Sequence, residues 1–393
     1  MGRKALAFIT THPIQYQAPL FRSLAAHPDL ELEVFFCHQA SAAEQADAGF
    51  GVKFDWDIPL LDGYSHRFLQ NVARRPRIAG FGGLDTPEIK DIVARGRFAA
   101  VMINGWHYKS AWQTMRACWR TQTPVMVRSD SHLHNERSSV KRAGKWPVYN
   151  WFISRLDACV PVGSWSSDYF LHYGAAPERV FVVPHAIDTE LFSSEARRLA
   201  PERNALRAQW GLDESAVVFL FAGKFTENKR PADFVDAVGH AARRGSRVAG
   251  LMVGDGPLRG ACEELVNGEN LPIAFAGFLN QSRISEAYAA ADALVLPSTT
   301  ETWGLVVNEA MACGLPCFVS DGVGCGPDMI TTGETGAVFR LGDTQALGQL
   351  MSDFAANTEQ ITQMRERATE QAQKYTLRVA VDRMVAAVEA VSR

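Results

Sequence analysis

Short apolar runs alternate with amphipathic segments along the first half of the chain. Residues 5–11 form an apolar run, residues 18–26 carry helical spacing, and residues 30–36 form a second apolar run. Two strands joined by a helix within about thirty residues are typical of a βαβ unit, so we predict a parallel, doubly wound sheet. We expect further strands at residues 99–103, 124–127, 158–162 and 180–183, and helices at residues 110–120 and 165–173, the second capped by Ser164.

The same alternation resumes after a hinge candidate at residues 184–189. Residues 193–212 are polar with helical spacing, and residues 375–391 repeat apolar residues as a long amphipathic helix does. Between them, apolar runs lie at residues 217–222, 248–253, 273–276, 293–296, 317–319 and 337–339. The expected fold class is therefore α/β with two facing Rossmann-like domains, whose cleft would bind the ligand. We expect domains at residues 1–185 and 186–373, followed by a C-terminal helix at 374–393.

Composition and charge narrow the class of protein. The 393 residues are 47% hydrophobic and 21% charged, and no apolar run is long enough to span a bilayer, so we expect a cytoplasmic protein. Through His185 the chain has 21 Lys and Arg against 16 Asp and Glu, a net +5, whereas the remainder has 19 against 27, a net −8. A net charge of −3 and the lack of a binding motif argue against nucleic acid. Seven scattered cysteines predict buried thiols rather than disulfides or a metal site.

Two stretches of the second half carry residues suited to a pyrophosphate between sugars. Gly223 ends an apolar strand, and Lys224 and Lys229 follow it, so this turn is a candidate phosphate cradle. The alternative is a solvated loop with ordinary surface lysines. Glu301 follows another buried strand, and Gly304 opens a helix that contains Glu309. The unpaired N–H groups at that helix start favour an anion.

Other glycine-rich turns are weaker signals. Gly254-Asp255-Gly256-Pro257 lacks the spacing of a dinucleotide-binding fingerprint. Gly322 to Pro327 comes nearer to that spacing, but its proline and late position favour a plain loop. Asp55-Trp56-Asp57 is a literal DxD, which we interpret as a solvent-exposed turn rather than a metal site.

Taken in order, these stretches resemble the carboxyl-terminal domain of glycosyltransferase family 4. The resemblance covers about residues 180–390 and rests on the glycine and lysine turns, on Glu301-x7-Glu309 and on the segment from Ala310 to Pro316. Residues 184–188 stand where the family has its hinge, and residues 11–16 resemble a bacterial subgroup associated with surface polysaccharides. The family implies retaining enzymes of the GT-B architecture, with a C-terminal helix that returns to the N-terminal domain.

The resemblance also implies roles for individual residues. Glu301 would bind hydroxyls of the donor sugar and Glu309 those of the ribose, while Lys229 and Lys224, the latter at a position where the family usually has Arg, would neutralise the pyrophosphate. The remaining donor contacts would come from the cradle glycine, the base-binding loop and the helix start, namely Gly223, Gly277, Phe278, Trp303, Gly304 and Leu305. The donor would be a UDP- or GDP-linked sugar, and no metal or other cofactor is expected.

Polar residues that follow strands in the first half of the chain are the candidates for binding the sugar acceptor. Asp130 and His132 follow residues 124–127, and either could orient the acceptor hydroxyl or accept its proton. His107 and His12 follow two other strand ends, with capping or packing as the alternative role for each. We interpret His185 in the hinge as structural.

A basic and then aromatic stretch at residues 137–152, together with Arg74, Arg75 and Arg77, raises the hypothesis of peripheral contact with the inner face of a membrane. The alternative is a solvated basic helix that leads into a buried aromatic one. The acceptor would then be a glycan or a lipid-linked molecule. The function expected from all these features is retaining transfer of a hexosyl-type sugar from a nucleotide sugar to a hydroxyl group, in bacterial surface polysaccharide or glycolipid assembly. The alternatives are a nucleotide-sugar epimerase of similar fold and a non-catalytic sugar-nucleotide-binding protein.

Overall fold

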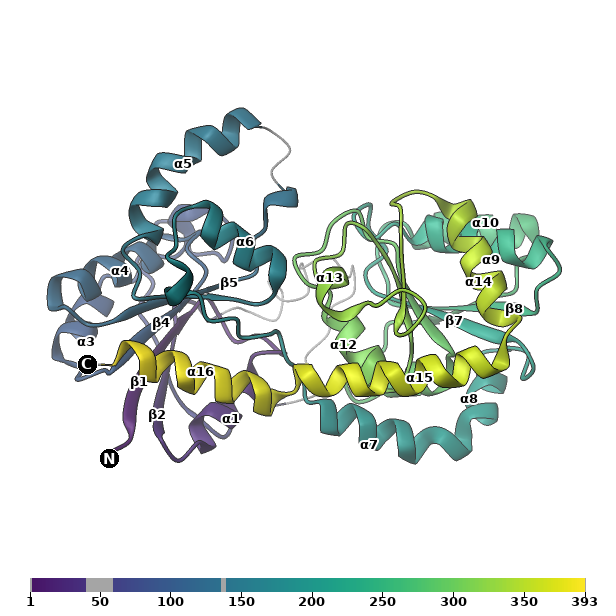
Figure 1. The fold of residues 1–393 in the computed structure, drawn as a ribbon, viewed down its shortest axis with the longest axis horizontal. Coiled ribbons are helices and arrows are strands. Elements are labelled where there is room, and N and C mark those ends of the chain that lie inside the picture. The colour runs from purple at the N-terminus through teal and green to yellow at the C-terminus, as the bar shows by residue number, and fades with distance from the viewer. Residues whose placement is uncertain (1, 40–58, 136–138, 393) are drawn as a thin grey trace. The chain divides into compact units, whose positions relative to one another are not determined.

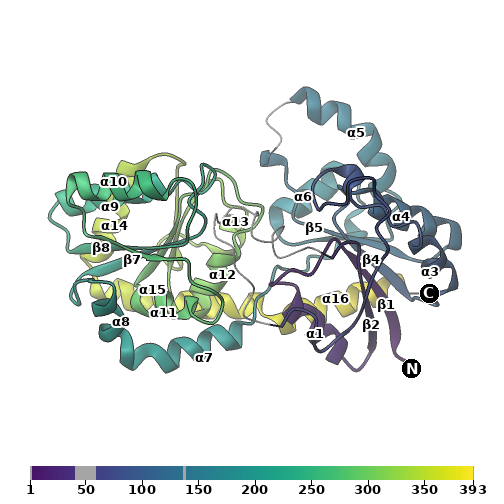
Figure 2. The same ribbon diagram turned by 180° about the vertical axis from the view of Figure 1, so that it is seen from behind.

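The computed structural model describes residues 2–39, 59–135 and 139–392, which divide into two compact units. The first unit contains the described residues up to Ile187 together with residues 377–392, and the second contains residues 188–376. Each unit is a six-stranded parallel sheet with helices on both faces (Figures 1 and 2). The α/β fold class with two doubly wound sheets is therefore confirmed.

The sheet of the first unit has the order β3-β2-β1-β4-β5-β6. Its strands are β1 (Lys4–Thr10), β2 (Leu30–Phe36), β3 (Ser65–Phe68), β4 (Ala100–Asn104), β5 (Val125–Ser129) and β6 (Ala158–Pro161). Its helices are α1 (Ala18–Ala26), α3 (Ile89–Arg95), α4 (Lys109–Thr121), α5 (Ser139–Ile153), α6 (Ser164–His172) and α16 (Leu377–Val391). The central strand β1 pairs with β2 and β4 in parallel, as the first βαβ pattern predicts.

The helix α16 packs on the sheet of this first unit. Its apolar residues Ala380, Met384 and Val388 are fully buried in one core cluster with Leu6 and Phe8 of β1. Their spacing of four residues keeps them on one helical face, which explains why the end of the chain joins the unit that contains its beginning.

Some expected elements of the first unit differ from the structure. Strand β3 is absent from the prediction because its residues are polar and mostly exposed, so no apolar run marks this edge strand. The strand expected at residues 180–183 is not formed: Val180 makes only an isolated bridge with Cys159, and Pro184 follows at once. Ser164 is the first residue of α6 rather than its cap, and Gly163 occupies the cap position.

The sheet of the second unit has the order β12-β11-β10-β7-β8-β9. Its strands are β7 (Val217–Ala222), β8 (Val248–Val253), β9 (Ile273–Gly277), β10 (Ala293–Leu296), β11 (Cys317–Ser320) and β12 (Gly336–Phe339). Its helices are α7 (Thr189–Leu199), α8 (Arg203–Gln209), α9 (Pro231–Arg243), α10 (Arg259–Glu269), α11 (Ile284–Ala290), α12 (Leu305–Ala312), α13 (Gly326–Met329), α14 (Thr344–Ala355) and α15 (Thr358–Ala372). The helix expected at residues 193–212 is two helices, because a 3-10 turn with Pro201 interrupts it.

Candidate active site

Three glycines lie side by side at the carboxyl ends of β7, β8 and β9. The N–H of Gly223 donates to Val253 O at 3.0 Å, and the N–H of Gly254 donates to Gly277 O at 2.8 Å. A Cβ on Gly254 would come within 1.9 Å of Gly223 O, and Gly254 has a φ of 124°. The two loops therefore approach so closely that only glycine fits at position 254.

Lys229 and Glu301 form the central charge pair of the second unit. Lys229 Nζ donates to Glu301 Oε1, and their side chains are 22% and 15% exposed. Asn228 holds the two loops together, because its Nδ2 donates to Thr300 O at 2.9 Å and its carbonyl accepts the N–H of Thr299 at 2.7 Å. Asn228 thus holds the lysine loop after β7 against the acidic loop after β10.

Lys224 lies in the same loop as Lys229. Burial lowers the pKa of Lys224, and the positive charge of Lys229 lowers it further, while Glu301 raises it. Two ammonium groups held near each other favour an anion that relieves their repulsion, and a pyrophosphate would do so.

The loop after β11 frames the position of Glu301. The N–H of Glu301 donates to Gly322 O, and the N–H of Gly324 donates to Glu301 O, both at 3.0 Å. A Cβ at either glycine would come within 2.3 Å of a backbone oxygen of the acidic loop. The glycine-rich stretch from Gly322 to Pro327, expected to be a plain loop, therefore positions Glu301 by close backbone approach.

The start of α12 lies directly after Glu301. Gly304 takes the cap position with a φ of 107°, and Leu305 is the first helical residue. Trp303 is buried, and its Nε1 donates to Asn308 Oδ1 at 2.8 Å, which holds the turn against the helix. The N–H of Val307 donates to Gly304 O at 2.9 Å, whereas the N–H groups of Leu305 and Val306 precede any carbonyl of the helix that could accept them, so this end of α12 favours negative charge.

Glu309 lies in the last turn of α12 and is held by Tyr288 of α11. The Tyr288 hydroxyl donates to Glu309 Oε2 at 2.6 Å. Burial raises the pKa of Glu309 to about 7, against the opposing effect of this hydrogen bond. Glu309 can therefore exchange a proton near neutral pH, which no feature of the sequence signals.

In the first unit, a cavity of about 260 Å³ collects residues from several strand ends. Its polar lining includes Thr11, Tyr16, Asn104, His107, Arg128, Ser129, Asp130 and His185. Six of these eight residues, all except His107 and Asp130, were not among the predicted site residues. The strand-end rule could have found Arg128 and Ser129, the last two residues of β5, whereas Tyr16 and His185 reach the cavity from loops.

Burial dominates the electrostatics of this cavity. It raises the pKa of Tyr16 to about 12 and lowers that of Arg128 to about 10. Burial and the nearby Arg128 lower the pKa of His185 to about 3, so this imidazole is neutral. Arg128 donates to Val183 O at 2.7 Å and Pro184 O at 3.3 Å, and so ties β5 to the segment before Asp188. Asp130 therefore provides a carboxylate to this cavity, in which Tyr16 and His185 are neutral and Arg128 is hydrogen-bonded to backbone carbonyls.

Only some of the predicted acceptor-side residues line this cavity. Asp130 and His107 line the cavity, but His132 and His12 do not. His132 is 2% exposed and packs on Trp165 with ring centroids 5.0 Å apart. Among the described residues neither of its ring nitrogens has a hydrogen-bond partner. His12 accepts or donates a bond of 2.9 Å between its Nδ1 and Thr11 Oγ1.

The remaining sequence predictions concern the cysteines, metal ligands, the DxD motif and membrane-spanning segments. All seven cysteines are buried free thiols, and the described ranges contain no group of three His, Cys, Asp or Glu that could hold a metal ion. The DxD at Asp55 and Asp57 lies outside the described residues. In the part of the chain that the structure describes, no helix has the length and apolar character needed to cross a membrane.

Comparison with known proteins agrees with this geometry. Residues 202–375 match the family described as Glycosyl transferases group 1, and residues 24–191 match Glycosyltransferase Family 4. The chain belongs to glycosyltransferase family 4. One match lies within the second unit, the other lies mostly within the first, and neither includes α16.

This family 4 chain is also similar to curated relatives. It is 32% identical over 167 residues to the N-acetyl-alpha-D-glucosaminyl L-malate synthase of Bacillus anthracis, which covers 42% of this chain and 43% of that protein. It is 29% identical over 223 residues to the D-inositol 3-phosphate glycosyltransferase of Streptomyces coelicolor, over 52% of this chain and 48% of that protein. The chain matches between 26% and 48% of the length of the first four curated relatives.

The fold is that of solved glycosyltransferase-like structures. The Anabaena protein HepE, solved in complex with UDP, matches 98% of this chain and 99% of its own chain with a TM-score of 0.74 and 17% identity. HepE has also been solved with UDP-glucose. At this identity the likeness concerns the fold alone, and that fold is the two-domain arrangement of parallel sheets expected from the sequence.

Proposed function

We propose that this protein is a glycosyltransferase that moves a hexosyl-type sugar from a UDP-linked donor to a hydroxyl acceptor with retention at the anomeric carbon. Its pathway would be bacterial surface polysaccharide or glycolipid assembly. The observation that carries this proposal is the Lys229–Glu301 pair, held beside the start of α12 at the carboxyl edge of a parallel sheet. Family membership and the UDP complexes of HepE support it.

In the proposed complex the donor pyrophosphate lies against Lys224, Lys229 and the first turn of α12. Glu301 accepts hydrogen bonds from hydroxyls of the transferred sugar and Glu309 from those of the ribose, since a carboxylate can accept two bonds from a diol. Gly277 and Phe278, at the end of β9, lie where the base would stack. In the free protein the ion pair keeps Lys229 and Glu301 in position, so little rearrangement is needed when the donor binds.

The reaction follows from these roles. The bond between the anomeric carbon and the β-phosphate oxygen breaks, and its electron pair leaves with the nucleoside diphosphate. The two lysines and the helix start stabilise that charge. The acceptor oxygen then bonds to the anomeric carbon from the same face, and its proton passes to the departing phosphate oxygen. Asp130 orients the acceptor hydroxyl, and no metal ion takes part.

The proposal is tested with α-linked UDP-, GDP- and ADP-sugars in two steps. Thermal shift and calorimetry first identify a donor, because a ligand that binds the folded state raises apparent stability. Proton NMR then follows the slow transfer of the sugar to water, and the first product is expected to be the α-anomer. A first product in the β-form would contradict retention, and a sugar epimerised at C2 would identify an epimerase.

Variants connect the activity to the site. Glu301→Gln and Lys229→Met are expected to abolish measurable transfer, whereas Glu227→Gln, an exposed carboxylate in the same loop, serves as the matched control. Binding of none of the nucleotide sugars by the wild-type protein would refute the proposal.

A further inference from the structure

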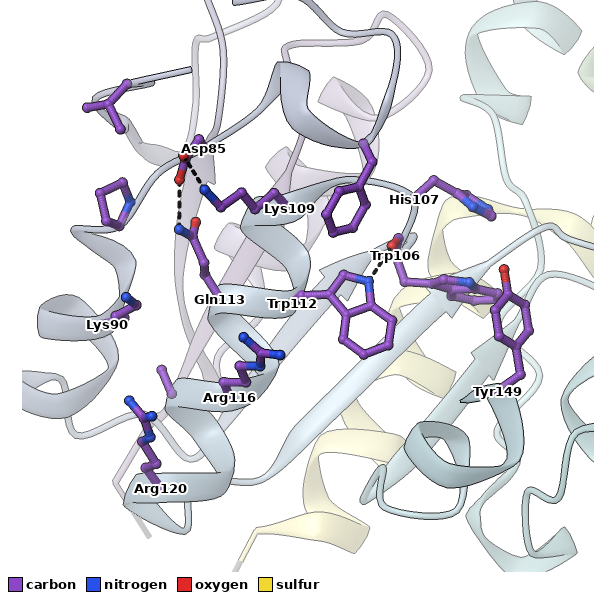
Figure 3. Close-up of a pocket in the computed structure, with 14 residues that line it drawn as sticks. Asp85, Lys90, Trp106, His107, Lys109, Trp112, Gln113, Arg116, Arg120 and Tyr149 are labelled. Atoms are coloured by element: carbon purple, nitrogen blue, oxygen red, sulfur yellow. Dashed lines mark hydrogen bonds and ion pairs between the residues drawn. The ribbon is translucent and has the colours of Figure 1, made fainter. Parts of the chain in front are cut away.

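A cavity of about 880 Å³ lies beside α4 in the first unit. We propose that it binds the anionic part of the glycosyl acceptor, a phosphate ester or a sugar acid, while the reacting hydroxyl lies in the smaller cavity with Asp130. This inference rests on the proposed function and deepens it. The cavity is lined from α3, α4 and α5 and by the loop before α3, and has the size of a small-molecule site (Figure 3).

Charge gives this cavity its preference for anions. Its lining has four cations, Lys90, Lys109, Arg116 and Arg120, against the single carboxylate of Asp85. Lys109 Nζ donates to Asp85 Oδ2 at 2.5 Å, and Gln113 Nε2 donates to Asp85 Oδ1 at 2.7 Å, so this carboxylate is already satisfied.

The three other cations have no such partner. Within the described residues, no ion pair involves Lys90, Arg116 or Arg120, and all three side chains are exposed. Arg116 and Arg120 are four residues apart on α4, so they lie on the same helical face. Two adjacent guanidinium forks are suited to a phosphate or carboxylate, which each can bind through two parallel hydrogen bonds.

Aromatic rings line the other part of the cavity. Trp112 Nε1 donates to Trp106 O at 3.0 Å, and Trp106 meets Tyr149 edge-on with ring centroids 6.0 Å apart. Figure 3 shows Lys90 and Arg120 on one side, Trp106 and Tyr149 on the other, and Trp112 between them. Trp106 is only 2% exposed and supports the other two rings, so the partly exposed Trp112 and Tyr149 offer apolar surface to a sugar ring or an apolar chain.

His107 joins this cavity to the smaller one, because it lines both. In the proposal the acceptor has its hydroxyl near Asp130 and extends past His107 to α4. Along that helix, Arg116 and Arg120 lie about 10 and 16 Å beyond Lys109, at 1.5 Å per residue. In the proposal the anion lies along α4, away from His107, so an acceptor that occupies both cavities is longer than one that occupies the smaller cavity alone.

Binding is tested in the full chain with the donor site filled by saturating UDP. Glucose 6-phosphate is titrated while the indole N–H resonance of Trp112, assigned with Trp112→Phe, is followed by NMR. We expect a saturable shift with glucose 6-phosphate and none with glucose. The Arg116→Gln/Arg120→Gln double variant is expected to weaken this binding about tenfold or more, since it removes two charge-assisted contacts. The matched control is Arg95→Gln/Arg97→Gln, which changes two exposed arginines outside the cavity.

A second arm identifies the source of the anion. Co-sedimentation with vesicles of 70% phosphatidylcholine and 30% phosphatidylglycerol reports lipid headgroups. Vesicle binding that depends on Arg116 and Arg120, without binding of glucose 6-phosphate, assigns the anion to a lipid, and the reverse assigns it to a soluble glycan. Failure of both probes with the wild-type protein, or equal binding by the double variant, overturns the inference. UDP-glucose binding, measured in parallel, tests the proposed function separately, because its residues lie in the other unit.

Discussion

Lys229 and Glu301 are 72 positions apart in the chain, yet their side chains form an ion pair in the second unit. Asn228 links the two loops that carry this pair, because it bonds to both Thr299 and Thr300. The pair places a cation and an anion beside the start of α12, where a nucleotide sugar would present its phosphate and its hydroxyls.

This pair leads to a prediction about transfer activity. Asn228→Ala leaves both charged groups intact but removes the side-chain bond to Thr300, so the two loops lose one of their links. We expect transfer to fall about tenfold, less than the loss of 100-fold or more expected for Glu301→Gln. Steady-state kinetics with the identified donor measures both. Equal activity of Asn228→Ala and the wild-type protein would show that the loops are held by other contacts.

A second prediction concerns the pH dependence of donor binding. Glu309 has a pKa raised to about 7, and the proposed ribose contact needs its ionised form. Affinity for UDP-glucose, whose diphosphate does not titrate in this range, should therefore increase as the pH rises from 5.5 to 8.5. The increase should disappear in Glu309→Gln. Tyr288→Phe removes a bond that lowers the pKa, so its midpoint should move to higher pH. A pH-independent affinity in the wild-type protein would contradict the role of Glu309.

The same carboxyl predicts the pH dependence of stability. The folded-state pKa is higher than the ordinary value of 4.5, so between these values the folded protein binds more protons than the unfolded chain. Stability should therefore decrease as the pH rises from about 4.5 to 7, with a contribution from Glu309 on the order of 2 to 3 kcal/mol. Urea unfolding of the wild-type protein and Glu309→Gln at several pH values measures it, and parallel curves would rule it out.

A fourth prediction concerns Asp292, a residue near the site that we expect to contribute to stability. Asp292 precedes β10 and accepts from Arg203 at 2.7 Å, from Arg207 at 2.6 Å and from the N–H of Val218 at 2.9 Å. Arg207 is 3% exposed, so Asp292→Ala would leave a buried charge unpaired and cost about 3 to 5 kcal/mol. Denaturant unfolding checks this value. Arg198→Ala, which breaks an exposed pair, should cause no measurable change and is the control.

The glycine contact at the donor loops gives a fifth prediction. Gly254→Ala would force its Cβ against Gly223 O in a backbone conformation that alanine rarely adopts, so we expect loss of several kcal/mol and of UDP binding. Gly260→Ala in α10 has no heavy atom within 4 Å of its Cβ and should leave stability unchanged or raise it. Thermal unfolding and calorimetry with UDP measure both variants. A stable Gly254→Ala protein that binds UDP would contradict the close approach of the two loops.

The pattern of apolar residues along the chain was enough to predict the strands that are buried on both faces of a sheet. Residues 217–222, 248–253 and 293–296 were predicted with the bounds that the structure has, because continuous apolar runs mark such strands. The polar edge strand β3 carries no such run, and Pro201 divides a helix that the spacing alone had joined.

The candidate active site was likewise predictable from the sequence only in part. Glu301, Glu309 and the lysines could be named from the sequence because strand ends, helix starts and a family resemblance are local in the chain. Their partners could not: Tyr288 reaches Glu309, and Gly322 reaches Glu301, only when separate loops are brought together. The Gly322 loop, which the sequence favours as a plain connection, is a support of the acidic loop.

The sequence by itself determined the two parallel sheets, their helices and the residue types that suit a nucleotide sugar, since these follow from periodicity and from short motifs. Only the tertiary structure decided which charges are paired, how burial shifts their pKa values, and that Lys90, Arg116 and Arg120 line one cavity with the aromatic residues Trp112 and Tyr149. Burial and pairing depend on contacts between residues distant in the chain, and no local pattern encodes them.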